Sequence, residues 1–234
     1  MGINQLKKQI EELADPNQAA QLQRFFKTEP GGYGEGDRFL GLRMPQLRKL
    51  VKGHLEMPLK DVAKLLHSPI HEYRMAALLM LTYRYPKANI DEQVAIYRFY
   101  LDNTAWINNW DLVDVTVPHI VGAHLMTRSR KVLYRLAESK SLWERRISII
   151  ATFYFIRQDQ FEDTLNIAAL LLDDDHDLIH KAVGWMLREV GKRDEKEMED
   201  FLLPRYQGMP RTMLRYAIEK LPEPRRRAYL KGTL

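Results

Sequence analysis

The chain has 234 residues, with 36 Lys and Arg against 31 Asp and Glu, which gives a formal net charge of +5. This length suits one large domain or two small ones, and the absence of cysteine excludes disulfide scaffolds, thiolate zinc sites and cysteine nucleophiles. No apolar run approaches the roughly 20 residues that a membrane span needs, and no signal-peptide core is present, so we expect a soluble, cytoplasmic protein without a membrane partner. The positive surplus favours a polyanionic partner only weakly.

Apolar residues recur at intervals of three and four residues along almost the whole chain, which predicts helices throughout. We expect helices near residues 2–14, 16–27, 45–54, 58–67, 70–85, 90–102, 109–122, 129–138, 142–157, 160–173, 177–191, 195–203 and 210–220. The segment 113–117 alternates as a strand does, but Pro118 and the helical neighbours on both sides favour a helix there.

Two kinds of signal mark where these helices begin. Proline at a first helical position is expected at Asp15-Pro16, Met44-Pro45 and Ser68-Pro69. Capping-box spacing, in which the first side chain accepts a hydrogen bond from the amide three residues on, occurs at Asn89…Glu92, Ser141…Glu144, Asp159…Glu162 and Asp194…Glu197. These starts describe short helices joined by short turns.

An internal repeat of about 36 residues, with two helices per period, runs through the chain. Glu72-Tyr73-Arg74 aligns with Glu144-Arg145-Arg146, and Trp110 stands midway between the two arginines. Such repeats stack helix pairs of the HEAT or armadillo sort. We therefore predict an all-α fold: a curved right-handed superhelix (solenoid) of HEAT-like helix pairs, with about 12 to 14 helices in one domain over residues 1–234.

Equivalent positions of a helical repeat point the same way, so they should form one row on the concave face. The row consists of Arg74, Trp110, Arg146, Lys181 and Arg215. One helical turn further lie Asp114, after Trp110, and Trp185, after Lys181. A tryptophan at helical spacing is more often a core residue, and a lone arginine is usually solvated. The residues alone leave a ligand surface and a packed core equally open.

Three further segments have candidate roles. The glycine-rich loop 29–37 matches neither the dinucleotide fingerprint nor the P-loop, which leaves a connecting loop or a phosphate-binding nest. The acidic segment 173–177 suits a solvated turn better than a metal site, and we expect no cofactor. The basic C-terminal cap 222–234 could hold phosphate or simply close the solenoid.

Three ordered motifs resemble the bacterial AlkD-like DNA alkylation repair glycosylases. They are Asn109-Trp110-Asp111-Leu112-Val113-Asp114, Trp143-Glu144-Arg145-Arg146, and Lys181-Ala182-Val183-Gly184-Trp185-Met186-Leu187-Arg188-Glu189. The segment 34–43 looks like the opening motif of one branch of that family. The similarity extends over roughly residues 20–220.

The resemblance implies a stack of HEAT-like repeats that grips duplex DNA in its concave face and hydrolytically removes N7- and N3-alkylated purines without a pocket for the base. By motif, Asp114 would be the catalytic carboxylate, and Arg146 the basic partner near the reaction centre. Trp110 and Trp185 would be aromatic walls beside the lesion. Some members have tyrosine where this chain has Phe25, so an aromatic contact with DNA is implied here without a hydroxyl.

The implied chemistry suits these residue types. Alkylation gives the base a positive charge, so it leaves without a proton donor, and one carboxylate can stabilise the cationic sugar or orient the attacking water. Candidate phosphate contacts on the groove are Arg74, Lys181, Arg188 and Arg215. We expect a monomer acting on double-stranded DNA. The alternatives are a non-catalytic binder of damaged or branched DNA and a protein-binding HEAT scaffold.

Overall fold

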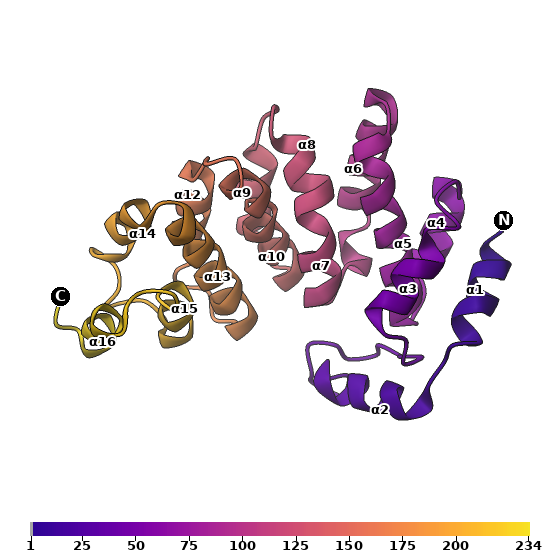
Figure 1. Ribbon diagram of the computed structural model, residues 1–234, viewed down its shortest axis with the longest axis horizontal. Helices are drawn as coiled ribbons and strands as arrows, with labels where there is room; N and C mark the ends of the chain where they lie inside the picture. The colour runs from indigo at the N-terminus through magenta and orange to yellow at the C-terminus, as the bar shows by residue number, and fades with distance from the viewer. Residues whose placement is uncertain (1) are drawn as a thin grey trace. The chain divides into compact units, whose positions relative to one another are not determined.

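A computed structural model describes residues 2–234, and these residues form helices joined by turns, with no strand among them (Figure 1). The predicted all-α fold is therefore confirmed. The chain divides into two compact units: unit 1 ends at Thr116 and unit 2 begins at Val117. In the part of the chain that is described, no helix is both long and apolar enough to span a bilayer. The curvature and handedness of the superhelix stay predictions.

Unit 1 is built around one buried helix. Its elements are α1 (Ile3–Glu11), α2 (Pro16–Phe25), α3 (Met44–Val51), α4 (Leu59–Leu66), α5 (His71–Arg84), a 3-10 turn (Tyr85–Lys87), α6 (Ile90–Asp102), a second 3-10 turn (Thr104–Trp106) and all but the last residue of α7 (Trp110–Val117). Helix α5 packs against α3 and α4, and every residue from His71 to Leu81 is buried. A helix buried on all sides must pair any charged side chain that it carries.

Unit 2 is a series of helices in which each packs against its neighbours. Its elements are a π-helical turn (Pro118–Gly122), α8 (Ala123–Leu125), α9 (Lys131–Ala137), α10 (Leu142–Ala151), α11 (Phe153–Ile156), α12 (Glu162–Leu170), α13 (Asp177–Arg193), α14 (Glu195–Leu202), α15 (Arg211–Ala217) and α16 (Glu223–Lys231). Helix α10 contacts α9 and α13, and α13 contacts α12, α14 and α15. A Cβ atom at Gly184 would lie 2.4 Å from the Met213 carbonyl oxygen, so only glycine permits the approach of α15 to α13.

Most of the predicted helix starts are confirmed. The Asp15 carboxylate accepts hydrogen bonds from the amides of Asn17 and Gln18, at 2.9 and 3.1 Å, and Pro16 is the first residue of α2. The side chains that cap α6, α10 and α14 are Asn89, Ser141 and Asp194, as the capping-box spacing predicts. The alternating segment 113–117 is helical and belongs to α7.

Two predicted helix starts are wrong because the residues form hydrogen bonds with distant segments instead of beginning or capping a helix. Pro69 stays outside α5, and its carbonyl oxygen accepts a hydrogen bond from the Arg38 amide at 3.0 Å. Asp159 does not cap α12; it adopts a left-handed conformation, with φ of 56°, and its carboxylate binds Arg193 at 2.7 and 2.8 Å. The sequence also gave no prediction of α16, which occupies most of the basic C-terminal cap.

The repeat accounts well for the helices of unit 2. Arg146, Lys181 and Arg215 are each the fifth residue of their helix, in α10, α13 and α15. Their surroundings differ, however, because Arg146 is 5 % exposed whereas Arg215 belongs to the exposed residues. Cations at equivalent positions of the repeat therefore differ in their solvent exposure.

Candidate functional site

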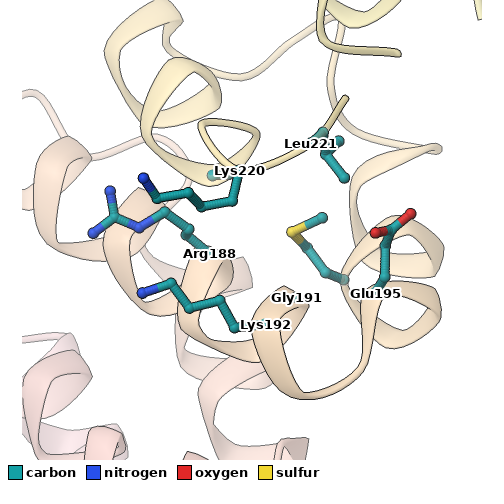
Figure 2. Close-up of a pocket in the computed structure, with 8 residues that line it drawn as sticks. Arg188, Gly191, Lys192, Glu195, Lys220 and Leu221 are labelled. Atoms are coloured by element: carbon teal, nitrogen blue, oxygen red, sulfur yellow. The ribbon is translucent and has the colours of Figure 1, made fainter. Parts of the chain in front are cut away.

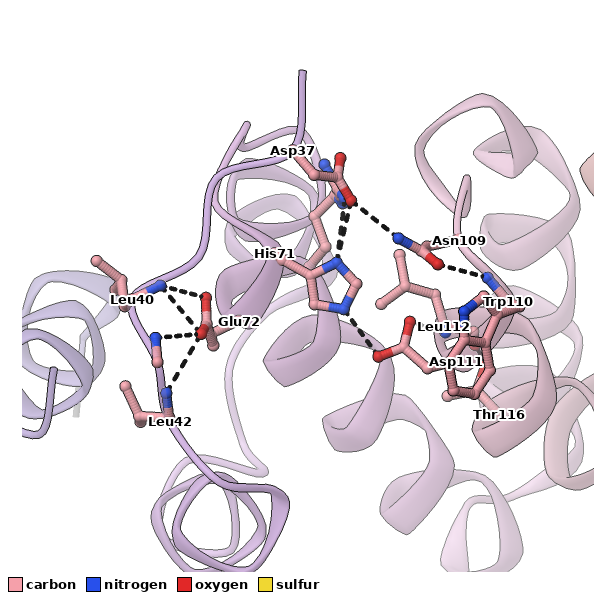
Figure 3. Close-up of polar contacts among 12 residues, drawn as sticks. Asp37, Leu40, Leu42, His71, Glu72, Asn109, Trp110, Asp111, Leu112 and Thr116 are labelled. Atoms are coloured by element: carbon pink, nitrogen blue, oxygen red, sulfur yellow. Dashed lines mark hydrogen bonds and ion pairs between the residues drawn. The ribbon is translucent and has the colours of Figure 1, made fainter. Parts of the chain in front are cut away.

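A buried polar network joins the glycine-rich loop to the first turns of α5 and α7 (Figure 3). Asp37 Oδ2 lies 2.6 Å from Arg74 Nη2, 3.2 Å from His71 Nδ1 and 3.2 Å from Asn109 Nδ2. The other ring nitrogen of His71, Nε2, lies 2.9 Å from Asp111 Oδ2. One imidazole thus bridges two carboxylates that belong to different segments of unit 1.

The charges of this network stabilise one another. Burial alone would lower the pKa of His71, but the carboxylates of Asp111 and Asp37 outweigh it and raise that pKa to about 9. Burial alone would raise the pKa of Asp37, but hydrogen bonds from His71 and Arg74 lower it below the usual value. At neutral pH the network therefore contains an imidazolium ion between two carboxylates.

Glu72, the next residue of α5, holds the segment that follows the loop. Its carboxylate accepts hydrogen bonds from the amides of Leu40, Gly41 and Leu42, the shortest to each measuring 2.9, 2.8 and 3.3 Å (Figure 3). Within the loop, a Cβ atom at Gly34 would lie 2.3 Å from the Phe26 carbonyl oxygen. Glycine is required there because the loop passes directly over the end of α2.

The loop and α2 also fix the indole of Trp110 at the start of α7. Its Nε1 donates a hydrogen bond to the Tyr33 hydroxyl at 3.2 Å, and its ring stacks on Phe26, with centroids 5.2 Å apart. The ring of Phe25 meets it edge-on, with centroids 5.8 Å apart, and Phe25 is 62 % exposed. A half-buried indole and an exposed phenyl ring are thus held side by side by contacts within unit 1.

Asp114 lies one helical turn after Trp110 and is half-buried. Burial, and to a lesser extent the charge of Asp114, raise the pKa of the buried Tyr100 phenol. The Tyr100 hydroxyl lies 2.9 Å from the Thr116 hydroxyl in the interior of unit 1. Asp114 therefore lies at the border between the apolar interior of unit 1 and its surface.

A family model described as "DNA alkylation repair enzyme" matches residues 6–221. The chain belongs to the DNA alkylation repair enzyme family. A predicted DNA alkylation repair enzyme from Enterococcus faecalis has a similar fold, with a TM-score of 0.70 and 17 % sequence identity, over 90 % of this chain and 97 % of that chain. No curated protein matches the sequence. Membership of this family supports a role in DNA repair, with DNA as the partner.

The other residues that the sequence assigns to the repair site lie in unit 2. The Arg146 guanidinium is buried in α10 and donates a hydrogen bond to the Leu178 carbonyl oxygen. Trp185, in α13, is half-buried; its Nε1 donates to Glu189 Oε1 at 3.0 Å, and its ring lies beside Phe153 with centroids 5.8 Å apart. The roles of Arg146 and Trp185 stay predictions.

Two of the candidate phosphate contacts of unit 2 have acidic partners. Lys181 Nζ lies 2.7 Å from Asp177, and Arg188 forms an ion pair with Glu219. Arg188 also lines a cavity of about 250 Å³ together with Lys192 and Lys220, whose ammonium groups come from α13 and from the segment after α15 (Figure 2). A phosphate that binds Lys181 or Arg188 would have to displace the carboxylate partner of that side chain or bind beside it.

One predicted DNA contact is wrong. Arg74 is 2 % exposed, and its guanidinium binds the carboxylate of Asp37 and the carbonyl oxygen of Ser68. The reason is that α5 is buried on all sides, so a cation in its first turn points into the unit instead of to a groove. Arg74 is thus a structural cation in this family member, and its guanidinium is not exposed to a phosphate.

Sequence reasoning missed Asp37, His71, Glu72 and Asn109. The histidine has no metal-type spacing, and its partners lie 34 and 40 residues away along the chain. One signal could have found the network: a helix with apolar residues on every face that opens with His71-Glu72-Tyr73-Arg74 requires buried partners for its charges. In the described part of the chain, no group of three acidic or histidine side chains is arranged to hold a metal ion.

Proposed function

We propose that this family member is a DNA glycosylase that hydrolyses the N-glycosidic bond of cationic N7- or N3-alkylated purines in duplex DNA. The observation that carries the proposal is the placement of Trp110 and Asp114 on one side of α7, both half-buried. An indole and a carboxylate one helical turn apart present an aromatic face and a negative charge to the same ligand.

Alkylation at N7 or N3 leaves a positive charge on the base, so the C1′–N9 bond breaks with its electron pair passing to the base and neutralising that charge. The sugar then develops oxocarbenium character, which a nearby carboxylate stabilises electrostatically. Water supplies the oxygen that bonds to C1′, and its proton passes to solvent. In this proposal Asp114 stabilises the sugar, positions the water, or does both.

The remaining predicted residues assist in this proposal. The indoles of Trp110 and Trp185 contact the alkylated nucleotide, where a cation–π contact contributes about 0.5–2 kcal/mol. Arg146 provides the positive charge near the reaction centre, and Phe25 contacts DNA through its exposed ring. Lys181, Arg188 and Arg215 bind phosphates, each adding about −0.9 to the slope of log affinity against log salt concentration. The enzyme acts as a cytoplasmic monomer.

The test is release of N7-methylguanine from methylated duplex DNA, measured by chromatography of the free base. Asp114→Asn should lower the rate by about 100-fold or more and leave DNA affinity within a factor of about three, because the amide keeps the shape but loses the charge. Asp102→Asn is the matched control, since it removes a carboxylate from the exposed end of α6, and it should keep the full rate.

Other outcomes separate the alternatives. If Asp114→Asn releases the base as fast as the unaltered protein, the assignment of Asp114 is wrong. If the unaltered protein binds DNA with a steep salt dependence and releases no base from any alkylated duplex, it is a non-catalytic DNA binder. If DNA association is weak and insensitive to salt, the protein is a scaffold for other proteins.

A further inference from the structure

The two residues that flank Trp110 tie the first turn of α7 to two other segments of unit 1 (Figure 3). On one side, the buried Asn109 donates from Nδ2 to the Asp37 carboxylate at 3.2 Å, and its Oδ1 accepts from the Trp110 amide at 2.8 Å. On the other side, the Asp111 carboxylate lies 2.9 Å from Nε2 of His71. Contacts to the glycine-rich loop and to α5 therefore hold the backbone before and after the indole.

A helix start does not need such distant contacts. At α6 the cap is local, because the Asn89 side chain accepts only from the Glu92 amide, three residues on. The contacts at the start of α7 reach 72 residues back to Asp37 and 40 residues back to His71. A local cap stabilises a helix wherever it lies, whereas contacts with two distant segments also set the direction of the helix within unit 1.

The contact between His71 and Asp111 is strong and well fixed. The imidazole is charged at neutral pH, and a hydrogen bond between ionised partners is about twice as strong as a neutral one. The charged groups that face His71 are Asp37, Asp111 and Arg74. The ring also stacks on Phe39, with centroids 4.4 Å apart. Packing and hydrogen bonds thus hold the imidazole in one orientation toward α7.

The side chains of the proposed reaction follow the orientation of that turn. Asp114 lies three residues after Asp111 and four after Trp110, so all three occupy neighbouring positions on the helix surface. A tilt of the first turn would displace the indole and the carboxylate together. A catalytic group must be held within about 0.5 Å of its productive place, and a displacement of about 1 Å can lower a rate by about 100-fold.

We propose that Asp37 and His71 are positioning residues that fix the first turn of α7. The indole of Trp110 and the carboxylate of Asp114 take their places from that turn. Asp37 and His71 are 6 % and 3 % exposed, so in this proposal they act through α7 and not by contact with DNA. The importance of this position for catalysis rests on the proposed function, whereas the hold on α7 rests on the contacts alone.

The experiment compares base release with DNA binding in His71→Gln. An imidazole presents one nitrogen to each carboxylate, whereas glutamine carries its donors on a single nitrogen and cannot bridge them. Release of N7-methylguanine is measured in a single turnover with the DNA saturated by protein, at a temperature where circular dichroism shows the variant to be folded. The rate should fall by about 10- to 100-fold, and DNA affinity should stay within a factor of about three.

A second variant, Asn109→Ser, acts on the other side of the indole. Serine keeps a side-chain oxygen that can cap α7, but it is too short to reach the Asp37 carboxylate. The start of the helix is thus preserved while its link to the glycine-rich loop is lost. We expect a fall in the single-turnover rate of at least about tenfold, and this variant replaces His71→Gln if that one does not fold.

Two control variants lower the stability of unit 1 by changes outside the network. Tyr73→Phe, in the same turn of α5, removes a hydroxyl that donates to Glu11 of α1. Met80→Ala removes a fully buried side chain further along α5 and should cost about 2–5 kcal/mol. Both should keep the full rate of release from bound DNA. They separate a loss of stability from a displacement of α7.

Hydrogen exchange tests the hold on α7 without any activity. In His71→Gln the amides of residues 111–116 should exchange at least about tenfold faster than in the unaltered protein, while those of α6 should not change. In Met80→Ala the amides of α6 and α7 should change alike, because the whole unit is destabilised.

Each outcome decides one point. Unchanged release in both His71→Gln and Asn109→Ser, an equal fall in Met80→Ala, or unchanged exchange in α7 would overturn the inference. If the unaltered protein releases no base, the proposed function fails. In that case the exchange of α7 alone decides whether the network fixes its first turn.

Discussion

Trp110 in unit 1 and Trp185 in unit 2 are both half-buried, yet they are held in different ways. Trp110 contacts Phe25, Phe26 and Tyr33, which lie more than 70 residues earlier in the chain. Trp185 donates to Glu189, one turn further along its own helix. The position of the Trp110 indole thus depends on contacts with distant segments of unit 1. The Trp185 indole, in contrast, has its hydrogen-bond partner within its own helix, α13.

One ion pair from each unit shows a similar contrast. In unit 1 the side chains of Asp37 and Arg74 are each 3 % exposed. In unit 2 the side chains of Arg188 and Glu219 are 16 % and 44 % exposed. Removing one partner of a buried pair leaves an uncompensated charge in a poorly solvated place, whereas an exposed pair is screened by water. We therefore expect the Asp37–Arg74 pair to matter far more for stability than the Arg188–Glu219 pair does.

The largest expected effect follows Asp37→Asn. This change removes the carboxylate that neutralises Arg74 and helps to neutralise His71, so the free energy of unfolding should fall by about 3–5 kcal/mol. The measurement is urea denaturation followed by circular dichroism. The matched change in unit 2, Glu219→Gln, should cost less than about 1 kcal/mol. Equal losses from the two variants would contradict the proposed contrast.

A smaller effect concerns the pH dependence of stability. The pKa of His71 is about 9 in the folded protein and about 6.5 in an unfolded chain, so the folded state holds an extra proton between these values. The stability that this proton contributes is complete below about pH 6.5 and is lost as the pH rises through 9. The free energy of unfolding should therefore fall by up to about 1.4 kcal/mol per pH unit in this window.

The variant His71→Gln checks that slope, because glutamine does not titrate. Denaturation in urea at a series of pH values from 6.5 to 9.5 should give a flatter profile for His71→Gln than for the unaltered protein. His67→Gln, at an exposed position, should keep the original slope. A profile that stays steep in His71→Gln would mean that another group titrates in this range.

The smallest expected effect concerns the two indole hydrogen bonds. Tyr33→Phe removes the hydroxyl that accepts from Trp110 and donates to the Phe25 carbonyl oxygen, and it should lower the free energy of unfolding by about 1 kcal/mol. Glu189→Gln keeps an acceptor for the Trp185 indole and should stay within about 0.5 kcal/mol of the unaltered protein. A greater loss from Glu189→Gln than from Tyr33→Phe would reverse the comparison.

Much of the helical fold could be predicted because its determinants are local. The caps at Asn89, Ser141 and Asp194 need only a side chain and an amide three residues apart, and all three are present. Prediction failed at Ser68-Pro69 and at Asp159, where distant segments compete for the same groups. Helix α16 was missed because its arginines obscure the apolar period; within it Tyr229 is buried.

The candidate site was predictable only in part. The family motif predicts roles for Trp110 and Asp114 that stay predictions, and nothing in the spacing of the sequence brings Asp37 to His71 and Asn109. Those contacts arise because the chain returns to the glycine-rich loop twice: at His71, after α3 and α4, and at Asn109, after α5 and α6. Arg74 shows what the repeat cannot predict. Equivalent positions of the repeat are expected to point the same way, but the burial of each side chain depends on how many helices surround it.

The hydrogen bonds that Glu72 accepts from the amides of Leu40, Gly41 and Leu42 should slow the hydrogen exchange of these amides. These three amides belong to no helix or strand, and such segments ordinarily exchange their protons through local fluctuations. Here the acceptor is a buried carboxylate in the first turn of the central helix, so we expect the amides to open together with that helix. A connecting segment should therefore exchange as slowly as the core of unit 1 and report its global opening.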